Sequence, residues 1–353
     1  MLALATQYGL VPQRGYEEWR DLWISNPAYK AMNGNWPMGW VLDDGEHIVG
    51  HMGNIPAFYQ LGGETFIGAS GHGWVVDQNH RGYSLFLLDR YLQQKSADIV
   101  LSNTANSRSY QAHLQLGGQC VPAGKWDQSS FWITNYSALL KDWLRRKNIP
   151  LPKLLSYPAS FALSFKDGLR RLKISAHIPD DAILEVCTAF DGRFDSFWNQ
   201  LCHRYPNKFL AVRDRATLEW HFKYAAREQR LSIVTLTQGG EMKAYGVLVL
   251  VRGKQEDPIR RVNLADFQSL DTNSDFYSGT LRFALEHCRQ TGIHVLSTTG
   301  VSASGIDVSM AAPYHSPATN WTFIYKPRNP RLSEILADQN VWCPSLYDGD
   351  ASL

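Results

Sequence analysis

The stretch Val75-Val-Asp-Gln-Asn-His-Arg-Gly-Tyr-Ser-Leu-Phe-Leu-Leu88 joins an apolar run directly to a helical pattern. Residues 65–76 predict a long strand, and apolar residues recur at helical spacing over residues 83–94. A strand that turns directly into a helix points several backbone N–H groups at one spot, with the positive end of the helix dipole behind them. The stretch therefore predicts a site for a diphosphate, where Arg81 adds charge and Gly82 adds room.

The sequence before this stretch predicts a helix followed by two hairpins. Residues 16–24 place three large apolar side chains on one helical face. Residues 39–42 and 47–52 predict strands joined by a tight Asp-Gly turn, because Asp-Gly supplies the positive φ that a hairpin needs. A second hairpin joins residues 57–61 to the long strand. After the helix come a strand at 98–102, a helix at 104–116 that ends at Gly117-Gly118, and a strand at 119–122.

The second half repeats this order of elements. Short helices are predicted at residues 194–201 and 216–222, followed by a hairpin of strands at 231–236 and 244–251. A further strand at 261–267, a helix at 276–288 and a last strand at 294–297 come next. The repetition predicts a duplicated unit, and the fold class is α+β with a mixed α/β sheet in each of two tandem domains. The expected boundaries are 1–135, a basic helix and linker at 136–190, a second domain at 191–330 and a tail at 331–353.

Composition excludes several classes of protein. The chain has 353 residues, 44% of them apolar, which suits two packed domains, and its net charge of +2 is too small to indicate DNA as a partner. No apolar run is long enough for a membrane span and the N-terminus lacks a signal peptide pattern, so we expect a cytoplasmic protein. Five widely spaced cysteines without a CxxC pair predict neither a disulfide framework nor a metal site.

Two motifs resemble the GNAT superfamily of N-acyltransferases. The family's coenzyme A loop is Gln/Arg-x-x-Gly-x-Gly/Ala; Arg81 takes its first position, and Ser84 and Phe86 stand where its two small residues are usual. A later family motif is Asn-x-x-Ala-x-x-x-Tyr-x-x-x-Gly-Phe. Residues 106–118 match it at Asn106, Ser109 and Gly117, with His113 at the tyrosine position and Gly118 at the final aromatic. Residues 213–222 and 342–350 are also similar to two-domain acyltransferases of bacterial polysaccharide gene clusters.

The resemblance implies an N-acyltransferase that takes acetyl-CoA or another acyl-CoA as donor and a small-molecule amine as acceptor, such as an amino sugar or amino acid derivative. The backbone of the long strand would hold the pantetheine arm and the oxyanion. His113 would be the general acid for the leaving thiolate. The family's carboxylate base falls near Ser70, so the expected base is His72, with Asp77 second. The expected donor-binding residues are Trp74, Val75, Val76, Arg81, Gly82, Tyr83, Ser84, Asn106 and Ser109.

Other interpretations stay open at this point. His113 and His72 could be structural histidines, and Asp77 could be a helix-terminal residue. Acyl carrier protein is an alternative donor, with the basic stretch 141–173 as its docking surface; a Fem-type transferase would use aminoacyl-tRNA on the same stretch. Ser84, Phe86 and Gly118 also fit an inactive GNAT-like binding module. The acidic stretch 271–275 replaces a phosphate loop in the second half, which would then shape the acceptor site. Trp74 is expected to restrict the acyl group to a short one.

Overall fold

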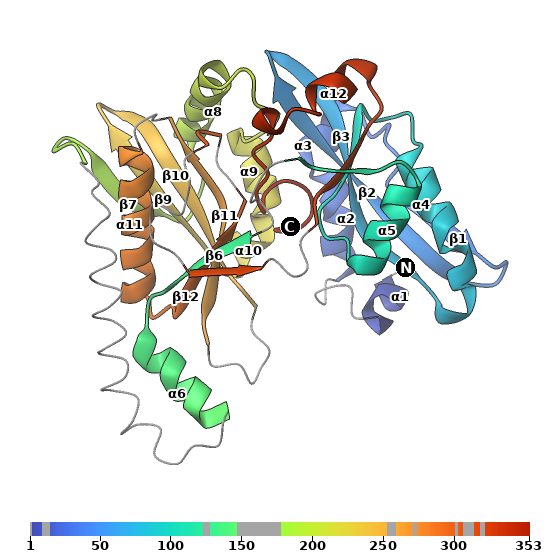
Figure 1. The fold of residues 1–353 in the computed structure, drawn as a ribbon, viewed down its shortest axis with the longest axis horizontal. Coiled ribbons are helices and arrows are strands. Elements are labelled where there is room, and N and C mark those ends of the chain that lie inside the picture. The colour runs from blue at the N-terminus through green and yellow to red at the C-terminus, as the bar shows by residue number, and fades with distance from the viewer. Residues whose placement is uncertain are drawn as a thin grey trace. The chain divides into compact units, whose positions relative to one another are not determined.

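The computed structural model describes residues 2–8, 15–122, 128–146, 178–252, 259–270, 274–300, 303–305, 314–317 and 322–353. The chain forms two compact units, each built from separate stretches of sequence (Figure 1). Unit 1 comprises Met1–Gly124, Pro206–His221 and Thr319–Leu353, and unit 2 comprises Lys125–Tyr205 and Phe222–Ala318. Among the described residues, no helix is both long and apolar enough to cross a bilayer.

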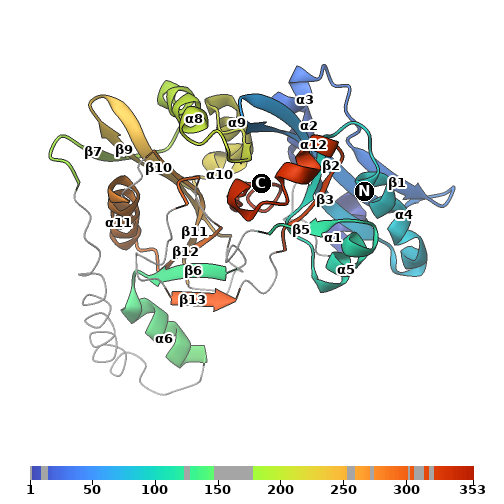
Figure 2. The ribbon, with the colours of Figure 1, turned by 45° about the horizontal axis from the view of Figure 1, so that its top comes forward.

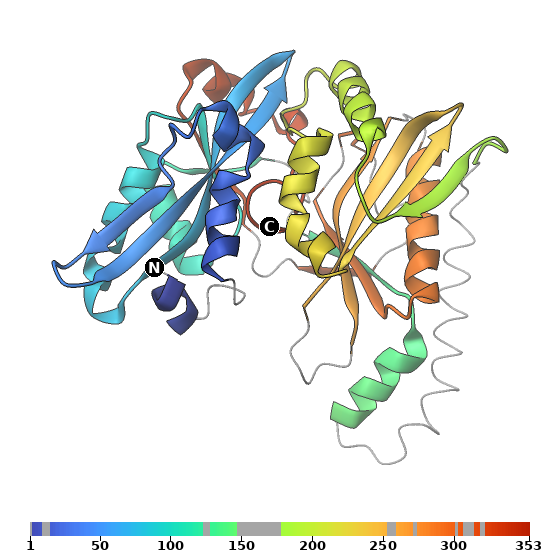
Figure 3. The same ribbon diagram turned by 180° about the vertical axis from the view of Figure 1, so that it is seen from behind.

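Unit 1 is a mixed sheet with helices on both faces. Its strands are β1 (Gly39–Asp43), β2 (Ile48–Leu61), β3 (Glu64–Val76), β4 (Ile99–Ser102), β5 (Gln119–Cys120), β8 (Leu210–Ala211) and β14 (Ile324–Pro327). The order is β1-β2-β3-β4-β14-β5, with β8 beside the far end of β2. Its helices are α1 (Leu2–Gln7), α2 (Tyr16–Ile24), α3 (Pro27–Ala31), η1 (Gln78–Tyr83), α4 (Ser84–Leu92), α5 (Ser107–Gln115), α9 (Arg215–His221), α12 (Pro330–Ile335) and η3 (Gln339–Val341). Figure 3 shows α2 and α3 on the face opposite α4.

Unit 2 has the same plan. Its strands are β6 (Gln128–Ile133), β7 (Ile183–Cys187), β9 (Leu231–Gln238), β10 (Glu241–Leu250), β11 (Arg261–Ser269), β12 (Val295–Thr299) and β13 (Tyr314–Pro317), in the order β13-β6-β12-β11-β10-β9-β7. Its helices are α6 (Tyr136–Arg146), α8 (Gly192–Arg204), α10 (Lys223–Arg227) and α11 (Asp275–Gln290). In unit 1 three antiparallel strands lead through α4 to the parallel strand β4, and in unit 2 four antiparallel strands lead through α11 to the parallel strand β12. The predicted fold class, a duplicated mixed α+β unit, is confirmed.

The units exchange one strand, which the sequence did not reveal. β6 follows β5 along the chain but lies in the sheet of unit 2, between β12 and β13 (Figure 2). Conversely, β14 follows β13 along the chain but lies in the sheet of unit 1, between β4 and β5. The compact units are therefore discontinuous, whereas the predicted boundaries of 1–135 and 191–330 run continuously along the chain. The predicted linker, 136–190, also contains β7, the edge strand of unit 2.

A single carbonyl on β2 organises the core of unit 1. Two buried tryptophans, Trp23 from α2 and Trp36 from the segment between α3 and β1, donate their indole N–H groups to the Asn54 carbonyl at 2.7 and 2.9 Å. The Asn54 side chain in turn bonds the Pro37 carbonyl and Gln94. These bonds satisfy polar groups inside an apolar core, where an unpaired group would be costly. They lie at the middle of β2, which is one continuous strand and not the two separate strands predicted at 47–52 and 57–61.

Tyr91 marks the place where β3 and β4 separate. The last pair in the parallel ladder is Ser70 with Leu101, and β3 then continues to Val76 paired with β2 but no longer with β4. The fully buried Tyr91 hydroxyl from α4 hydrogen-bonds the carbonyls of Ala69, at 3.0 Å, and Leu101. A Cβ at Gly71 would lie 3.2 Å from this ring, so a glycine lets the ring approach the strand. The two strands therefore separate at the point where the buried Tyr91 hydroxyl hydrogen-bonds a carbonyl of each strand.

Replacing Tyr91 by Phe should lower the free energy of unfolding by about 1–3 kcal/mol, because two buried carbonyls lose their donor while the ring still fills its site. Urea denaturation followed by tryptophan fluorescence measures the change. Tyr16→Phe is the control, since Tyr16 is 60% exposed and its hydroxyl needs no protein partner. Equal stability of the Tyr91→Phe variant and the wild type would contradict the role given to this hydroxyl.

His51 on β2 should make stability depend on pH. Burial lowers its pKa to about 4, whereas an unfolded chain titrates near 6.5. As the pH falls, protons bind the unfolded state first, so stability is lost below about pH 6.5. Between about pH 7 and 5 the wild type should lose about 2 kcal/mol more than His51→Leu. Urea titrations at both pH values test this, and parallel losses in the two proteins would refute it.

Candidate active site

A cleft of about 850 Å³ opens in unit 1 where β3 continues without β4. One wall is the free end of β3, from Gly71 to Val76. The other walls are the start of α4, the segment leading into α5 with the first turns of that helix, and the last residues of the described chain. Because β3 has left the ladder, its backbone groups on this side have no strand beside them. The cleft thus offers unpaired main-chain hydrogen-bonding groups to a ligand.

The free part of β3 carries a bulge. His51 pairs with Val75 and Gly53 pairs with His72, so β3 has one residue more than β2 over this interval. Gly73 lies within the bulge at φ +61°, a conformation that favours glycine. The bulge changes the direction of the strand beside the cleft, which both His72 and Trp74 line.

The start of α4 presents cationic and polar groups to the cleft. Arg81 and Ser84 line it, and Tyr83, the residue before the helix, provides no side-chain cap. A side chain at the Gly82 position would meet no atom within 4 Å. Phe86, which replaces a small residue of the family loop, does not line the cleft; it is 64% exposed and stacks on Tyr83 at 6.2 Å. The loop therefore stays open despite the large side chain.

His72 is held by a carboxylate from the far end of the chain. Its Nδ1 lies 3.0 Å from Oδ2 of Asp350, and the Thr104 hydroxyl donates to the other oxygen, Oδ1, at 3.1 Å. All three residues line the cleft. An ionised carboxylate only accepts hydrogen bonds, so the proton of neutral His72 belongs on Nδ1, leaving the Nε2 lone pair available. This is the protonation state that a general base requires.

His113 lies in α5 and is 2% exposed. Its Nδ1–H donates to the Ser109 carbonyl at 2.7 Å, and its Nε2 has no partner among the described residues. Burial lowers the pKa of His113, so the ring is neutral near pH 7 and Nε2 is an acceptor. Trp74 meets this ring edge-on at 6.0 Å, and its buried indole N–H has no described partner either. Both of these nitrogens are buried, and the one proton of the neutral His113 ring is held by the Ser109 carbonyl.

Two predicted residues, Asp77 and Asn106, serve as helix N-caps. Asp77 accepts the Asn79 N–H at 2.9 Å and the Tyr8 hydroxyl at 3.2 Å, which lowers its pKa, and it does not line the cleft. Asn106 accepts the N–H groups of Arg108 and Ser109, so it begins α5. Asn106 and Ser109 still line the cleft, as do Val75 and Val76. Asp77 is thus held in a structural role at the end of β3.

The polar residues of the cleft that sequence reasoning missed include Thr104, Arg108 and Asp350. Arg108 lies inside the family motif, and its charge beside Asn106 was a usable signal. Asp350 lies in the stretch 342–350 that resembles two-domain acyltransferases, but nothing in the sequence connected it with His72. Neither Arg81 nor Arg108 forms an ion pair with a described residue. Within the described ranges, no three His, Cys, Asp or Glu side chains gather as a metal site would need. Residues 147–173 of the predicted carrier surface and 271–273 of the acidic stretch lie outside the described residues.

No protein-family model and no curated protein matches the sequence. Solved structures do. A GCN5-related N-acetyltransferase from Anabaena variabilis superposes with a TM-score of 0.54 and 12% identity, over 92% of this chain and 69% of the other. A GCN5-related N-acetyltransferase from Kribbella flavida superposes with a TM-score of 0.50 and 10% identity, over 93% of this chain and 68% of the other. The strand order, the separated strands and these superpositions agree with the resemblance seen in the motifs: the chain has the fold of the GCN5-related N-acetyltransferases.

Proposed function

We propose that unit 1 binds an acyl-CoA in the cleft and transfers a short acyl group to the amine of a small molecule, such as an amino sugar or amino acid derivative. The observation that carries this proposal is the cleft itself. It combines the free backbone of β3, the uncapped start of α4 and two arginines without carboxylate partners among the described residues. The fold, shared with solved N-acetyltransferases, supports the same activity.

The donor would bind along two walls of the cleft. Its diphosphate would lie at the start of α4, where Arg81, Ser84 and the helix dipole favour an anion. The room at Gly82 and the outward position of Phe86 allow this approach. Its pantetheine arm would follow the free edge of β3 from Trp74 to Val76. The Trp74 ring would restrict the acyl group to a short one.

The chemistry needs a base, an oxyanion site and a proton for the leaving thiolate. His72 Nε2 would take a proton from the acceptor's ammonium or from the amine as it attacks the thioester carbonyl. The β3 backbone N–H groups would stabilise the oxyanion. When the C–S bond breaks, the proton held by His72 would pass to the thiolate, whose conjugate acid has a pKa of about 8.5. His113 would hold the Trp74 ring, which it meets edge-on, at the wall of the cleft.

Arg81 should be needed for the diphosphate. Arg81→Ala is expected to weaken CoA binding about 10- to 100-fold, because the variant loses the binding free energy of one or two charge-assisted hydrogen bonds. Isothermal titration with CoA measures this, and pantetheine, which lacks the diphosphate, should bind both proteins alike. Arg90→Ala is the matched control, because Arg90 is exposed on α4 and does not line the cleft.

The same titration separates the donors. Absence of CoA binding by the wild type, together with turnover on acyl carrier protein, would reject CoA. Salt-dependent binding of aminoacyl-tRNA would favour a Fem-type transferase. Binding of CoA without turnover on any amine would favour a binding module.

His72→Gln should lower kcat about 100- to 10,000-fold, the usual loss when a general base is removed. Release of free thiol from acetyl-CoA, measured over a panel of amino sugars and amino acid derivatives, gives the rate. CoA affinity should stay within about twofold of the wild type, since His72 would act on the acceptor's proton. His47→Gln is the control, because His47 is exposed and outside the cleft. An unchanged kcat for His72→Gln would exclude it as the base.

A further inference from the structure

We propose that Asp350 is the positioning residue of His72, delivered into the cleft by a C-terminal tail, residues 342–353, that the rest of unit 1 holds in place. The inference rests on the proposed function, because it names the group that prepares the proposed base. Asp350 acts through His72 and would not itself touch the reacting atoms.

The Asp350 carboxylate is fixed on both oxygens. Oδ2 faces Nδ1 of His72 at 3.0 Å, and Oδ1 accepts the Thr104 hydroxyl at 3.1 Å. The carboxylate side chain is 8% exposed and that of His72 is 18% exposed, so the pair is shielded from water on most sides. A carboxylate held in this way keeps the imidazole proton on Nδ1 and the ring in one orientation. His72 Nε2 then presents its lone pair to the cleft.

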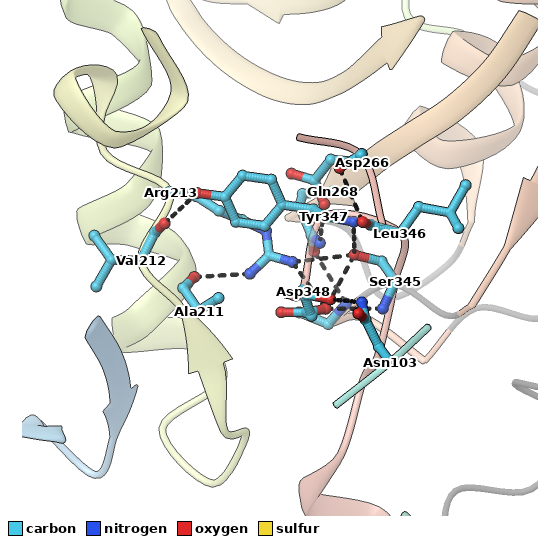
Figure 4. Close-up of polar contacts among 12 residues, drawn as sticks. Asn103, Ala211, Val212, Arg213, Asp266, Gln268, Ser345, Leu346, Tyr347 and Asp348 are labelled. Atoms are coloured by element: carbon cyan, nitrogen blue, oxygen red, sulfur yellow. Dashed lines mark hydrogen bonds and ion pairs between the residues drawn. The ribbon is translucent and has the colours of Figure 1, made fainter. Parts of the chain in front are cut away.

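A buried ion pair anchors the tail two residues earlier (Figure 4). Asp348 lies 3.6 Å from the Arg213 guanidinium, and it accepts the Ser345 N–H at 2.8 Å and the Ser345 hydroxyl at 3.0 Å. Arg213 is 2% exposed, donates to the Ala211 carbonyl at 2.7 Å and lies 4.5 Å from the centre of the Tyr347 ring. A charge pair this deeply buried is costly to break, because the remaining charge would be unpaired. Arg213 and Asp348 therefore hold the tail in one place.

The end of β4 fixes the tail from the other side. Asn103 donates its amide to the Asp348 carbonyl and accepts the Asp350 N–H at 3.4 Å. Between them Gly349 has φ +89°, and a Cβ there would lie 2.7 Å from the Asn103 side chain. Only glycine fits this conformation and this contact. Asn103 and Thr104 thus bind consecutive parts of the tail, and Asp350 meets His72 as a result.

The variants separate positioning from catalysis. Asp350→Asn should lower kcat about 10- to 1,000-fold with KM and CoA affinity within about twofold, because an amide can also donate to Nδ1 and favour the wrong tautomer. Asp350→Glu should restore part of the rate. The double variant His72→Gln with Asp350→Asn should be no slower than His72→Gln alone, since both changes remove one function. Asp338→Asn is the matched control; Asp338 caps η3 and does not line the cleft.

A spectroscopic measurement tests the inference apart from activity. ¹⁵N NMR of the imidazole, with His72 assigned through the His72→Gln spectrum, should show the proton on Nδ1 in the wild type and its redistribution in Asp350→Asn. Thr104→Val, which frees Oδ1, should give a smaller change of the same kind. A wild-type His72 protonated on Nε2, or a spectrum unchanged in Asp350→Asn, would overturn the proposal. If only the proposed function fails, the spectra should still show the His72 proton on Nδ1 in the wild type and its redistribution in Asp350→Asn, but no amine should be acylated.

Discussion

The separation of β3 from β4 is the constraint on which the cleft depends. Two parallel strands normally continue their ladder, because unpaired backbone groups inside a protein are costly. Here the ladder stops at Ser70 and Leu101, and the Tyr91 hydroxyl bonds the carbonyls of Ala69 and Leu101 at that point. The bulge at Gly73 then turns the remaining part of β3. The unpaired edge that results is the surface offered to a ligand.

The site is completed by segments that are distant in sequence. β14, from near the end of the chain, lies beside β4, and the following residues bring Asp350 to His72. Residues 206–221, which interrupt the second half of the sequence, belong to unit 1 and supply Arg213 for the ion pair with Asp348. Unit 1, which contains the cleft, is therefore built from three separate stretches of the chain, the last of which contains β14 and Asp350.

Several local features could be predicted because their signals are local. The helix at 83–94, the strand at 98–102 and the cap at Asn106 follow from hydrophobic periodicity and side-chain chemistry within a few residues. The order of elements in the second half was equally readable, and it gave the duplicated fold. The motif around Arg81 predicted an anion-binding position at the strand-to-helix turn, and the structure has Arg81 and Ser84 in the cleft.

Other features could not be read from local sequence. Phe86 occupies a position where the family has a small residue, yet only the packing of α4 shows that its ring points outward and stacks on Tyr83. The protonation state of His113 depends on the Ser109 carbonyl and on burial, and neither is visible in a motif. The discontinuous make-up of the two compact units could not be read from the sequence for a related reason. A strand's own residues specify that it is extended, whereas its partner strand is selected by packing.

By itself, the sequence determined that the chain forms two related α+β units and that a strand turns directly into a helix near Arg81. Hydrophobic periodicity and turn-forming residues act over a few neighbouring positions, so they can be recognised in the sequence alone. Only the tertiary structure decided which strands share a sheet, where β3 is left unpaired and which carboxylate meets His72. Asp350 lies 278 residues from His72 along the chain, and no local rule connects them. Their contact exists because the tail is held by Arg213 on one side and by Asn103 on the other.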